Sequence, residues 1–200
     1  MSSKESILLR NTNSILDHEI RLLKSKVDPY NCRLSILEAA ASIIGAWDLE
    51  EFNMLFNQSN ILLEPSESLR IGLLVIAELK KTEIPIPLGL AALAREPIDK
   101  SSQKSSGAYY TDWRLAQLLA EKSVSKVEVQ GKWVDPACGS GTLLVAALLE
   151  AKRLNLDIEN LISNSITGAD LSERALRGAR LSISSLTKNL STVAKMNLRL

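Results

Sequence analysis

The stretch Trp133-Val134-Asp135-Pro136-Ala137-Cys138-Gly139-Ser140-Gly141-Thr142-Leu143-Leu144 decides the fold. Apolar residues lead into an acidic residue, a loop of small residues follows, and an apolar run with helical spacing comes next. This order predicts a strand, a tight loop and a helix. Pro136 favours extended geometry at the residue before it, which places the Asp135 carboxylate at the carboxyl end of the strand.

The small residues of this loop suit a ligand site. Gly139 and Gly141 lack a Cβ, so the backbone turns sharply and a ligand can approach it closely. Ser140 or Thr142 is expected to cap the helix that follows. In open α/β sheets, ligands bind at the carboxyl ends of the strands, so the stretch is a candidate nucleotide site. An ordinary strand-to-helix turn uses the same residues and remains the alternative.

Two common nucleotide loops fit poorly. The dinucleotide fingerprint has a third glycine where this chain has Leu144, and no Gly-Lys-Ser of a P-loop follows. A second expected strand, residues 165–169, ends at Asp170, whose carboxylate is placed to accept hydrogen bonds from ribose hydroxyls. Capping of the helix expected over residues 174–186 is the alternative role for Asp170.

Asp135 to Gly141 resembles the cofactor loop of S-adenosylmethionine-dependent methyltransferases, and most of all that of the N6-adenine DNA methyltransferases of restriction-modification systems. Gly107-Ala108-Tyr109-Tyr110-Thr111 is similar to a segment that those enzymes carry ahead of the loop. Both matches stand in the family's order, and the resemblance covers about the second half of the chain. It implies S-adenosylmethionine as the cofactor, with the tyrosines near its methionine end.

The residues that the resemblance and the strand ends together assign to the cofactor lie in three short segments. They are Gly107, Tyr109, Tyr110, Thr111, Asp135, Pro136, Ala137, Cys138, Gly139, Gly141, Asp170 and Leu171. Thr111 is also expected to cap a helix that begins at Asp112. No catalytic residue is assigned, because the Asn/Asp-Pro-Pro-aromatic tetrapeptide that holds the target adenine in that family does not occur in this sequence.

The rest of the chain predicts an α-helical amino-terminal region, residues 1–97, a Ser-rich linker, residues 98–106, and a partial methyltransferase domain, residues 107–200. Expected helices in the first region cover residues 14–26, 32–47, 48–57, 69–80 and 88–95, with residues 1–13 frayed and 69–80 at the centre. Expected strands cover residues 132–135 and 165–169, and a third begins near 197. The predicted fold class is α/β, the start of a Rossmann-like doubly wound sheet.

Composition sets limits on function. Hydrophobic residues make up 46% of the 200 residues, enough for a core, and the net charge of +1 gives no signature of nucleic-acid binding. The basic residues of the second half, Arg177 and Arg180 among them, are expected on a solvated helix face. Two cysteines and one histidine, His18, indicate neither a disulfide scaffold nor a metal site. No apolar run reaches the length of a membrane span, and a cytoplasmic location is the default.

We therefore expect the cofactor-binding, amino-terminal part of an adenine-N6 DNA methyltransferase, which would meet DNA through the full-length enzyme and associate with a restriction or specificity subunit. Asp135 to Thr142 also resembles the loop of guanine-N2 RNA methyltransferases, although the Gly107 to Thr111 segment argues against them. A third alternative is a non-catalytic split or truncated subunit that serves as a scaffold. With two or three strands and an open sheet edge, marginal stability or self-association is expected.

Overall fold

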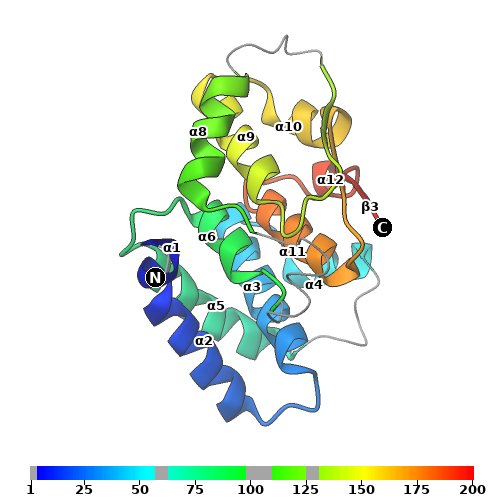
Figure 1. The fold of residues 1–200 in the computed structure, drawn as a ribbon. Helices are drawn as coiled ribbons and strands as arrows, with labels where there is room; N and C mark the ends of the chain where they lie inside the picture. Colours follow the sequence, from blue (N-terminus) through cyan, green and yellow to red (C-terminus); the bar gives the residue numbers. More distant parts are fainter. Residues whose placement is uncertain (1–3, 57–62, 98–109, 125–130) are drawn as a thin grey trace.

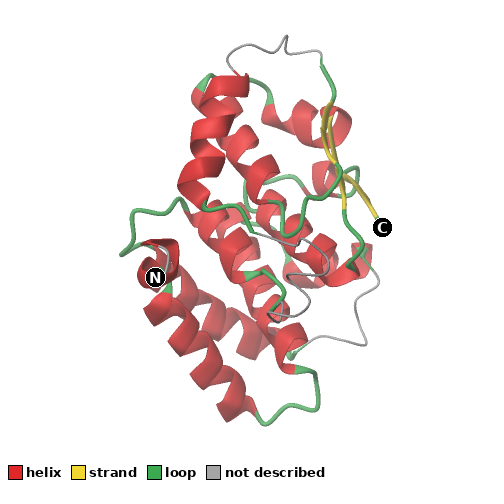
Figure 2. Cartoon of the chain, viewed as in Figure 1, coloured by secondary structure: helices red, strands yellow, loops and turns green. Residues whose placement is uncertain are grey.

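The computed structural model describes residues 4–56, 63–97, 110–124 and 131–200. Helices dominate, and three short strands lie together at one side of the molecule (Figure 1, Figure 2). The amino-terminal part holds α1 (Lys4–Leu8), α2 (Arg10–Leu23), α3 (Pro29–Gly45), α4 (Leu49–Leu55), α5 (Pro65–Leu79) and α6 (Ile86–Leu93). The remainder holds α8 (Trp113–Val124), β1 (Trp133–Asp135), α9 (Thr142–Arg153), α10 (Ile158–Asn160), the π-helix η1 (Leu161–Ser165), β2 (Ile166–Ala169), α11 (Glu173–Ser184), α12 (Leu190–Val193) and β3 (Asn197–Arg199).

The strands form a parallel sheet in the order β1-β2-β3. Asp135 pairs with Gly168, and Thr167 pairs with Asn197. The chain passes through α9 between β1 and β2 and through α11 between β2 and β3, because parallel neighbours need a crossover. This is an α/β arrangement with a helical region ahead of it, the start of a Rossmann-like fold, and the predicted fold class is confirmed.

The helical region is centred on α3, whereas the sequence had indicated residues 69–80. Residues 34–42 of α3 are all buried, but Leu73 and Leu74 of α5 are 56% and 40% exposed. α3 is buried because it packs against α5 on one side and against α11 on the other. Asp28 begins α3 by accepting hydrogen bonds from the Tyr30 and Asn31 amides at 2.9 and 3.1 Å.

The prediction of a frayed segment over residues 1–13 was wrong for the part that the structure describes. α1 begins at Lys4, and Leu9 is only 4% exposed. Glu5 is buried and pairs with Arg95, with 2.6 Å between Oε2 and the guanidinium Nη1. Glu5 also accepts a hydrogen bond from the Trp113 amide, at 3.3 Å. These contacts with distant residues order a segment whose own sequence is polar.

Two arginines join the helical region to the sheet region, which corrects the expectation of a solvated face. Arg177 of α11 is 4% exposed and forms two hydrogen bonds of 2.7 Å with the Glu38 carboxylate of α3. Arg180 lies over the Phe56 ring at 4.1 Å, and burial lowers the pKa of its guanidinium. Both charges are therefore partnered between elements, since an unpaired charge is costly to bury.

Some predicted features lie outside the described residues: the linker, Gly107 and Tyr109. The same holds for residues 59–60, where the sequence predicts a break in the helical pattern, and for most of residues 124–130, where it predicts an extended segment. Within the described ranges, no helix combines the length and the apolar character needed to cross a membrane.

Candidate cofactor site

The glycine loop follows β1 and is anchored to β2. The Asp135 Oδ1 accepts a hydrogen bond of 3.2 Å from the Ala137 amide, which turns the chain directly after the strand. The Cys138 amide donates to the Ala169 carbonyl at 2.8 Å, and the Gly141 amide donates to the Cys138 carbonyl at 2.8 Å. The loop is thus fixed at the carboxyl ends of two neighbouring strands, where the sequence placed it.

Both loop glycines have positive φ, +53° at Gly139 and +85° at Gly141. A Cβ at Gly141 would lie 3.1 Å from the Ala179 Cα, so α9 and α11 approach closely here. At Gly139 a Cβ would lie 3.9 Å from the Tyr110 ring, an ordinary contact. The first glycine therefore serves conformation alone, whereas the second serves conformation and packing.

The expected caps differ in the structure. Gly141 occupies the N-cap position of α9, and no side chain among the described residues caps the helix. The Ser140 hydroxyl is buried and has no hydrogen-bond partner in the described part of the chain. Likewise α8 begins at Trp113, and Asp112 rather than Thr111 accepts a hydrogen bond from its first turn, at 3.0 Å from the Arg114 amide. The first amides of α9 are therefore left for a ligand or solvent.

Asp170 joins the end of β2 to the glycine loop. Its Oδ2 accepts a hydrogen bond of 2.9 Å from the Gly139 amide, and its Oδ1 accepts one of 3.0 Å from the Ser172 amide. Ser172, not Asp170, is the N-cap of α11, with its hydroxyl 3.2 Å from the Ala175 amide. The capping role considered for Asp170 is therefore wrong, and its carboxylate faces the loop that the sequence predicted as its neighbour.

Negative charge is concentrated between the two strand ends. Burial raises the pKa of Asp135, the charge of Asp170 adds to the rise, and the Ala137 amide opposes it. Burial, and then the charges of Asp135 and Asp170, raises the pKa of the Cys138 thiol to about 12. Cys138 is therefore a protonated, packed side chain rather than a nucleophile. A cation placed here would relieve the repulsion between the carboxylates.

Of the upstream segment, Tyr110 and Thr111 are described. The Tyr110 ring lies beside Gly139, and its hydroxyl donates a hydrogen bond of 2.6 Å to the Glu96 carbonyl. Burial, followed by the charges of Glu96 and Asp170, raises the pKa of Tyr110. The Thr111 carbonyl accepts a hydrogen bond of 2.7 Å from Arg95. The structure thus brings Tyr110 to the glycine loop, and its expected contact with the methionine end of the cofactor stays a prediction.

The remaining predicted residues form the rim. Pro136 and Ala137 are exposed, and Leu171, directly after Asp170, is 99% exposed. The sequence did not identify Arg95 and Glu96, which contact the site. Two charged residues after an apolar helix look the same in the sequence whether they lie in a solvent-exposed loop or at a binding site.

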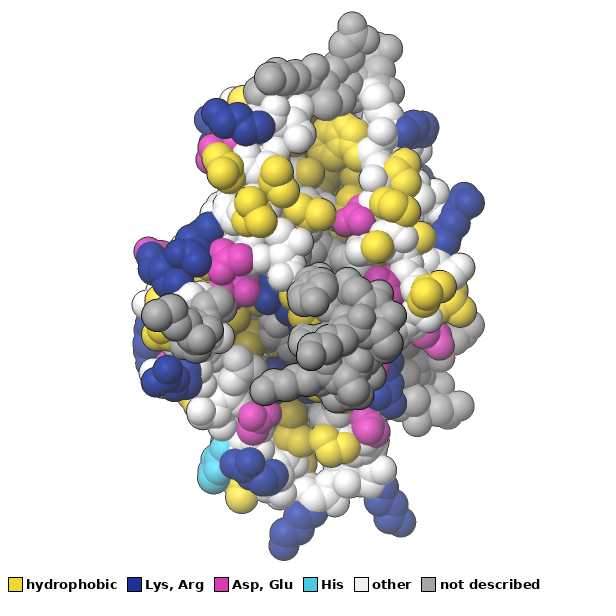
Figure 3. All heavy atoms as spheres, viewed as in Figure 1, with side chains coloured by type: hydrophobic (Ala, Val, Ile, Leu, Met, Phe, Trp, Pro, Cys, Tyr) yellow, Lys and Arg dark blue, Asp and Glu magenta, His cyan; other side chains and the backbone are white. Residues whose placement is uncertain are grey.

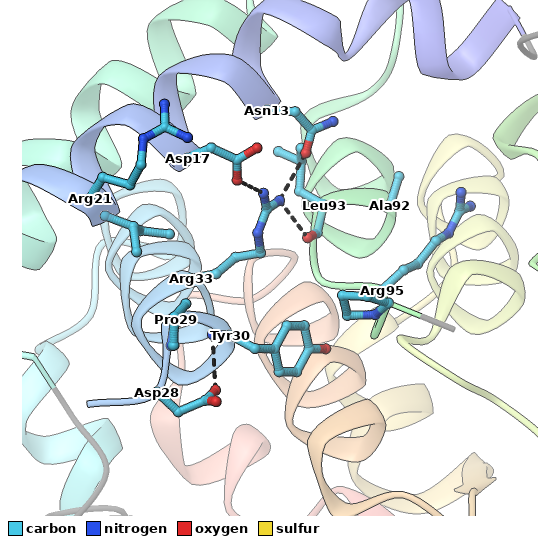
Figure 4. Close-up of a pocket in the computed structure, with 12 residues that line it drawn as sticks. Asn13, Asp17, Arg21, Asp28, Pro29, Tyr30, Arg33, Ala92, Leu93 and Arg95 are labelled. Carbon is cyan, nitrogen blue, oxygen red and sulfur yellow. Dashed lines mark hydrogen bonds and ion pairs between the residues drawn. The ribbon is translucent and has the colours of Figure 1, made fainter. Parts of the chain in front are cut away.

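Two hollows flank the site. One, of about 330 Å³, is lined by apolar residues of α8, β1 and α9 and borders Asp135; in Figure 3 yellow side chains surround it in the upper part of the molecule. The other, of about 700 Å³, lies in the helical region and ends at Arg95 and Pro97. Figure 4 shows its Arg33 held between Asp17, Asn13 and the Leu93 carbonyl, so that this charge is already paired.

The first strand of this parallel sheet runs through an acidic residue into a glycine loop, and the second ends at another acidic residue. This arrangement is typical of α/β domains that bind ligands at the carboxyl ends of their strands. Residues 114–197 match the family model described as "UPF0020: RMKL-like, methyltransferase domain". This segment is a methyltransferase domain, and such a domain implies S-adenosylmethionine as the methyl donor. No curated protein and no solved structure matched the chain.

The match confirms the methyltransferase part of the prediction and leaves the adenine-specific DNA family unconfirmed. It spans Asp135 to Gly141, Asp170 and Leu171, but it begins after Thr111. The segment that had distinguished the DNA enzymes therefore lies outside the matched region.

Proposed function

We propose that the chain binds S-adenosylmethionine at the carboxyl ends of β1 and β2. The observation that carries the proposal is the pair of carboxylates, Asp135 and Asp170, on either side of a glycine loop held by hydrogen bonds to β2 and Asp170. Asp170 receives the ribose hydroxyls, Leu171 covers the adenine, and the methionine part lies along the loop toward Tyr110.

Charge favours this cofactor over other adenosine ligands. S-adenosylmethionine carries a sulfonium and an ammonium group, whereas ATP and dinucleotides carry phosphates. The pKa of Asp135 is raised by burial and by its neighbour Asp170, so a further anion would be repelled and a cation attracted. When bound, the cofactor supplies the methyl group, and the chain's own residues bind it and set its orientation.

For the methyl acceptor we propose the N2 amino group of guanine in RNA. Members of the family whose model matches residues 114–197 are often guanine-N2 RNA methyltransferases. The sequence Asp135-Pro136-Ala137-Cys138-Gly139-Ser140-Gly141-Thr142 resembles their loop as well. Transfer to an exocyclic amine depends mainly on alignment of the amine with the methyl group, so the site contributes by positioning.

The N6 amino group of adenine in DNA is the second candidate. It is favoured by one specific observation, the Tyr110-Thr111 end of the upstream segment, whose ring lies beside Gly139. Enzymes acting on a base in a duplex turn that base out of the stack. Both candidates share an exocyclic amine on a purine, so they make the same demand on the cofactor site.

Calorimetric titration tests the cofactor. We expect saturable, one-to-one binding of S-adenosylmethionine, weaker binding of the product S-adenosylhomocysteine, which lacks the sulfonium charge, and no competition by ATP. Asp135→Asn should weaken binding, whereas Glu50→Gln, the matched change at an exposed position of α4, should not. Absence of binding by folded wild type, or tight binding of ATP, would overturn the proposal.

A labelling experiment tests the acceptor. The chain is incubated with S-adenosylmethionine tritiated at the methyl group and with either total RNA or unmethylated genomic DNA. The nucleosides are then separated by chromatography alongside authentic methylated standards. We expect label in N2-methylguanosine and none with Gly141→Val, whose side chain would clash with Ala179. Label in N6-methyldeoxyadenosine would instead establish the second candidate. Cofactor binding without any transfer would favour the scaffold alternative.

A further inference from the structure

Three successive residues after α6 contact the candidate site from the helical region. Ala94, Arg95 and Glu96 precede the part of the chain that matches the methyltransferase family. The Ala94 carbonyl accepts a hydrogen bond of 2.6 Å from the Tyr30 hydroxyl, and Ala94 packs so closely on α11 that a Cβ at Gly178 would lie 3.1 Å from its carbonyl oxygen. This packing fixes the backbone from which the next two side chains extend.

Glu96 links two segments that flank the site. Its Oε2 accepts a hydrogen bond of 2.7 Å from the Ser172 hydroxyl, and its backbone carbonyl accepts the bond of 2.6 Å from the Tyr110 hydroxyl. Its other carboxylate oxygen lies 3.8 Å from the Arg174 guanidinium. One residue thus holds both the aromatic ring beside Gly139 and the residue after Leu171.

Arg95 supports the same arrangement. Its guanidinium lies 5.3 Å from the centre of the Tyr110 ring and donates a hydrogen bond of 2.7 Å to the Thr111 carbonyl. Its charge is balanced by Glu5, and the two side chains are 15% and 7% exposed. Tyr110 is therefore held on its face by Arg95 and at its hydroxyl by Glu96.

The contacts continue to the glycine loop. The Ser172 amide donates to Asp170, and the other oxygen of the Asp170 carboxylate accepts from the Gly139 amide. Glu96, Ser172, Asp170 and Gly139 therefore form one hydrogen-bonded series, about 2.7 to 3.0 Å at each step. Rotation of Ser172 away from Glu96 would displace the turn that carries Leu171 and Asp170.

We propose that Glu96 is a positioning residue for the cofactor, acting through Ser172 to hold the Asp170-Leu171 turn in its binding geometry. This inference rests on the proposed binding of S-adenosylmethionine at that turn. The helical region is then part of the cofactor site rather than a separate attachment, and the affinity for the cofactor depends on a residue outside the matched methyltransferase segment.

A double-mutant cycle on cofactor affinity tests this role. We expect Glu96→Ala to weaken binding roughly tenfold, as for loss of a charge-assisted hydrogen bond. Glu96→Gln, which keeps an oxygen that accepts from Ser172, should restore most of the affinity. In the Ser172→Ala background, Glu96→Ala should cost little further affinity, because the hydrogen bond between the two side chains is already lost. The loss of the α11 cap occurs in both arms of the cycle and cancels.

The control is Glu83→Gln, at an exposed glutamate that pairs with Lys4 outside the site. It should leave cofactor affinity unchanged. Melting temperatures measured without cofactor separate positioning from general stability. If Glu96 positions the turn, Glu96→Gln should bind the cofactor more tightly than Glu96→Ala although the two variants melt at the same temperature. If wild type binds and the two effects are additive, or if Glu96→Ala binds as wild type does, this inference alone fails. If folded wild type does not bind, the proposed function fails with it.

Discussion

Leu171 offers the sharpest test of where the adenosine lies. The side chain is 99% exposed, so its truncation removes no contact with the residues that the structure describes. Exposed substitutions of this kind change the free energy of unfolding by less than about 0.5 kcal/mol. Leu171→Ala should therefore leave the stability of the protein without cofactor unchanged, and any loss of affinity reports a contact with the ligand.

The size of the loss follows from the area covered. Truncation of Leu to Ala removes the Cγ and both Cδ groups, at ~0.8 kcal/mol each when fully buried. A flat adenine covers one side of the chain, so about half of that total, ~1.2 kcal/mol, is lost on binding. This corresponds to a roughly eightfold higher Kd.

Calorimetry at constant pH and salt measures this effect, with urea unfolding to verify equal stability. Leu22→Ala, at a leucine of α2 that is 60% exposed, is the matched control and should bind S-adenosylmethionine as wild type does. Wild-type affinity in Leu171→Ala would refute the placement of adenine against the end of β2. Asp170→Ala discriminates less well, because Asp170 also holds the Gly139 and Ser172 amides.

Four further outcomes are expected. Cofactor affinity should fall as the pH drops from 7 toward 3.8, the ordinary pKa of an aspartate. Because the pKa of Asp135 is raised, this carboxylate takes up a proton within that window and loses its attraction for the sulfonium. Stronger binding on acidification would contradict this prediction. Asp135→Asn should remove that part of the pH dependence and raise the melting temperature at pH 7, since a carboxylate with a raised pKa opposes folding when charged. Cys138, with its pKa raised to about 12, should react with DTNB at pH 8 only after unfolding, and rapid labelling of native protein would show an open loop. Gly141→Ala should lower the urea midpoint of unfolding more than Gly139→Ala does. Both variants place a Cβ at positive φ, but only the Cβ at position 141 would lie 3.1 Å from Ala179. Equal midpoints would argue against that packing.

Much of the local structure was readable from the chain. α9 and α11 each begin one residue before their expected starts, residues 143 and 174, and β2 ends at Ala169, directly before Asp170, as expected. The prolines, glycines and apolar spacing that define these boundaries act on backbone torsions within a few residues of themselves. The prediction that Ser140 or Thr142 caps α9 was wrong because it considered only neighbouring residues. The Ser140 side chain instead packs toward Gly178 of α11, which is distant in the sequence.

In the site, too, some features follow from the local sequence and others from tertiary packing. The sequence by itself determined the glycine loop and the acidic residue at each strand end, because strand, turn and helix signals are local. That the Leu171 side chain is exposed is known only from the structure. Only the tertiary structure decided that Glu96 meets Ser172 and that Arg177 is buried on Glu38, a pair separated by 139 positions. Polar residues gain such partners when packing excludes water around them, and that exclusion depends on which helices pack together rather than on the residues next to them in the chain.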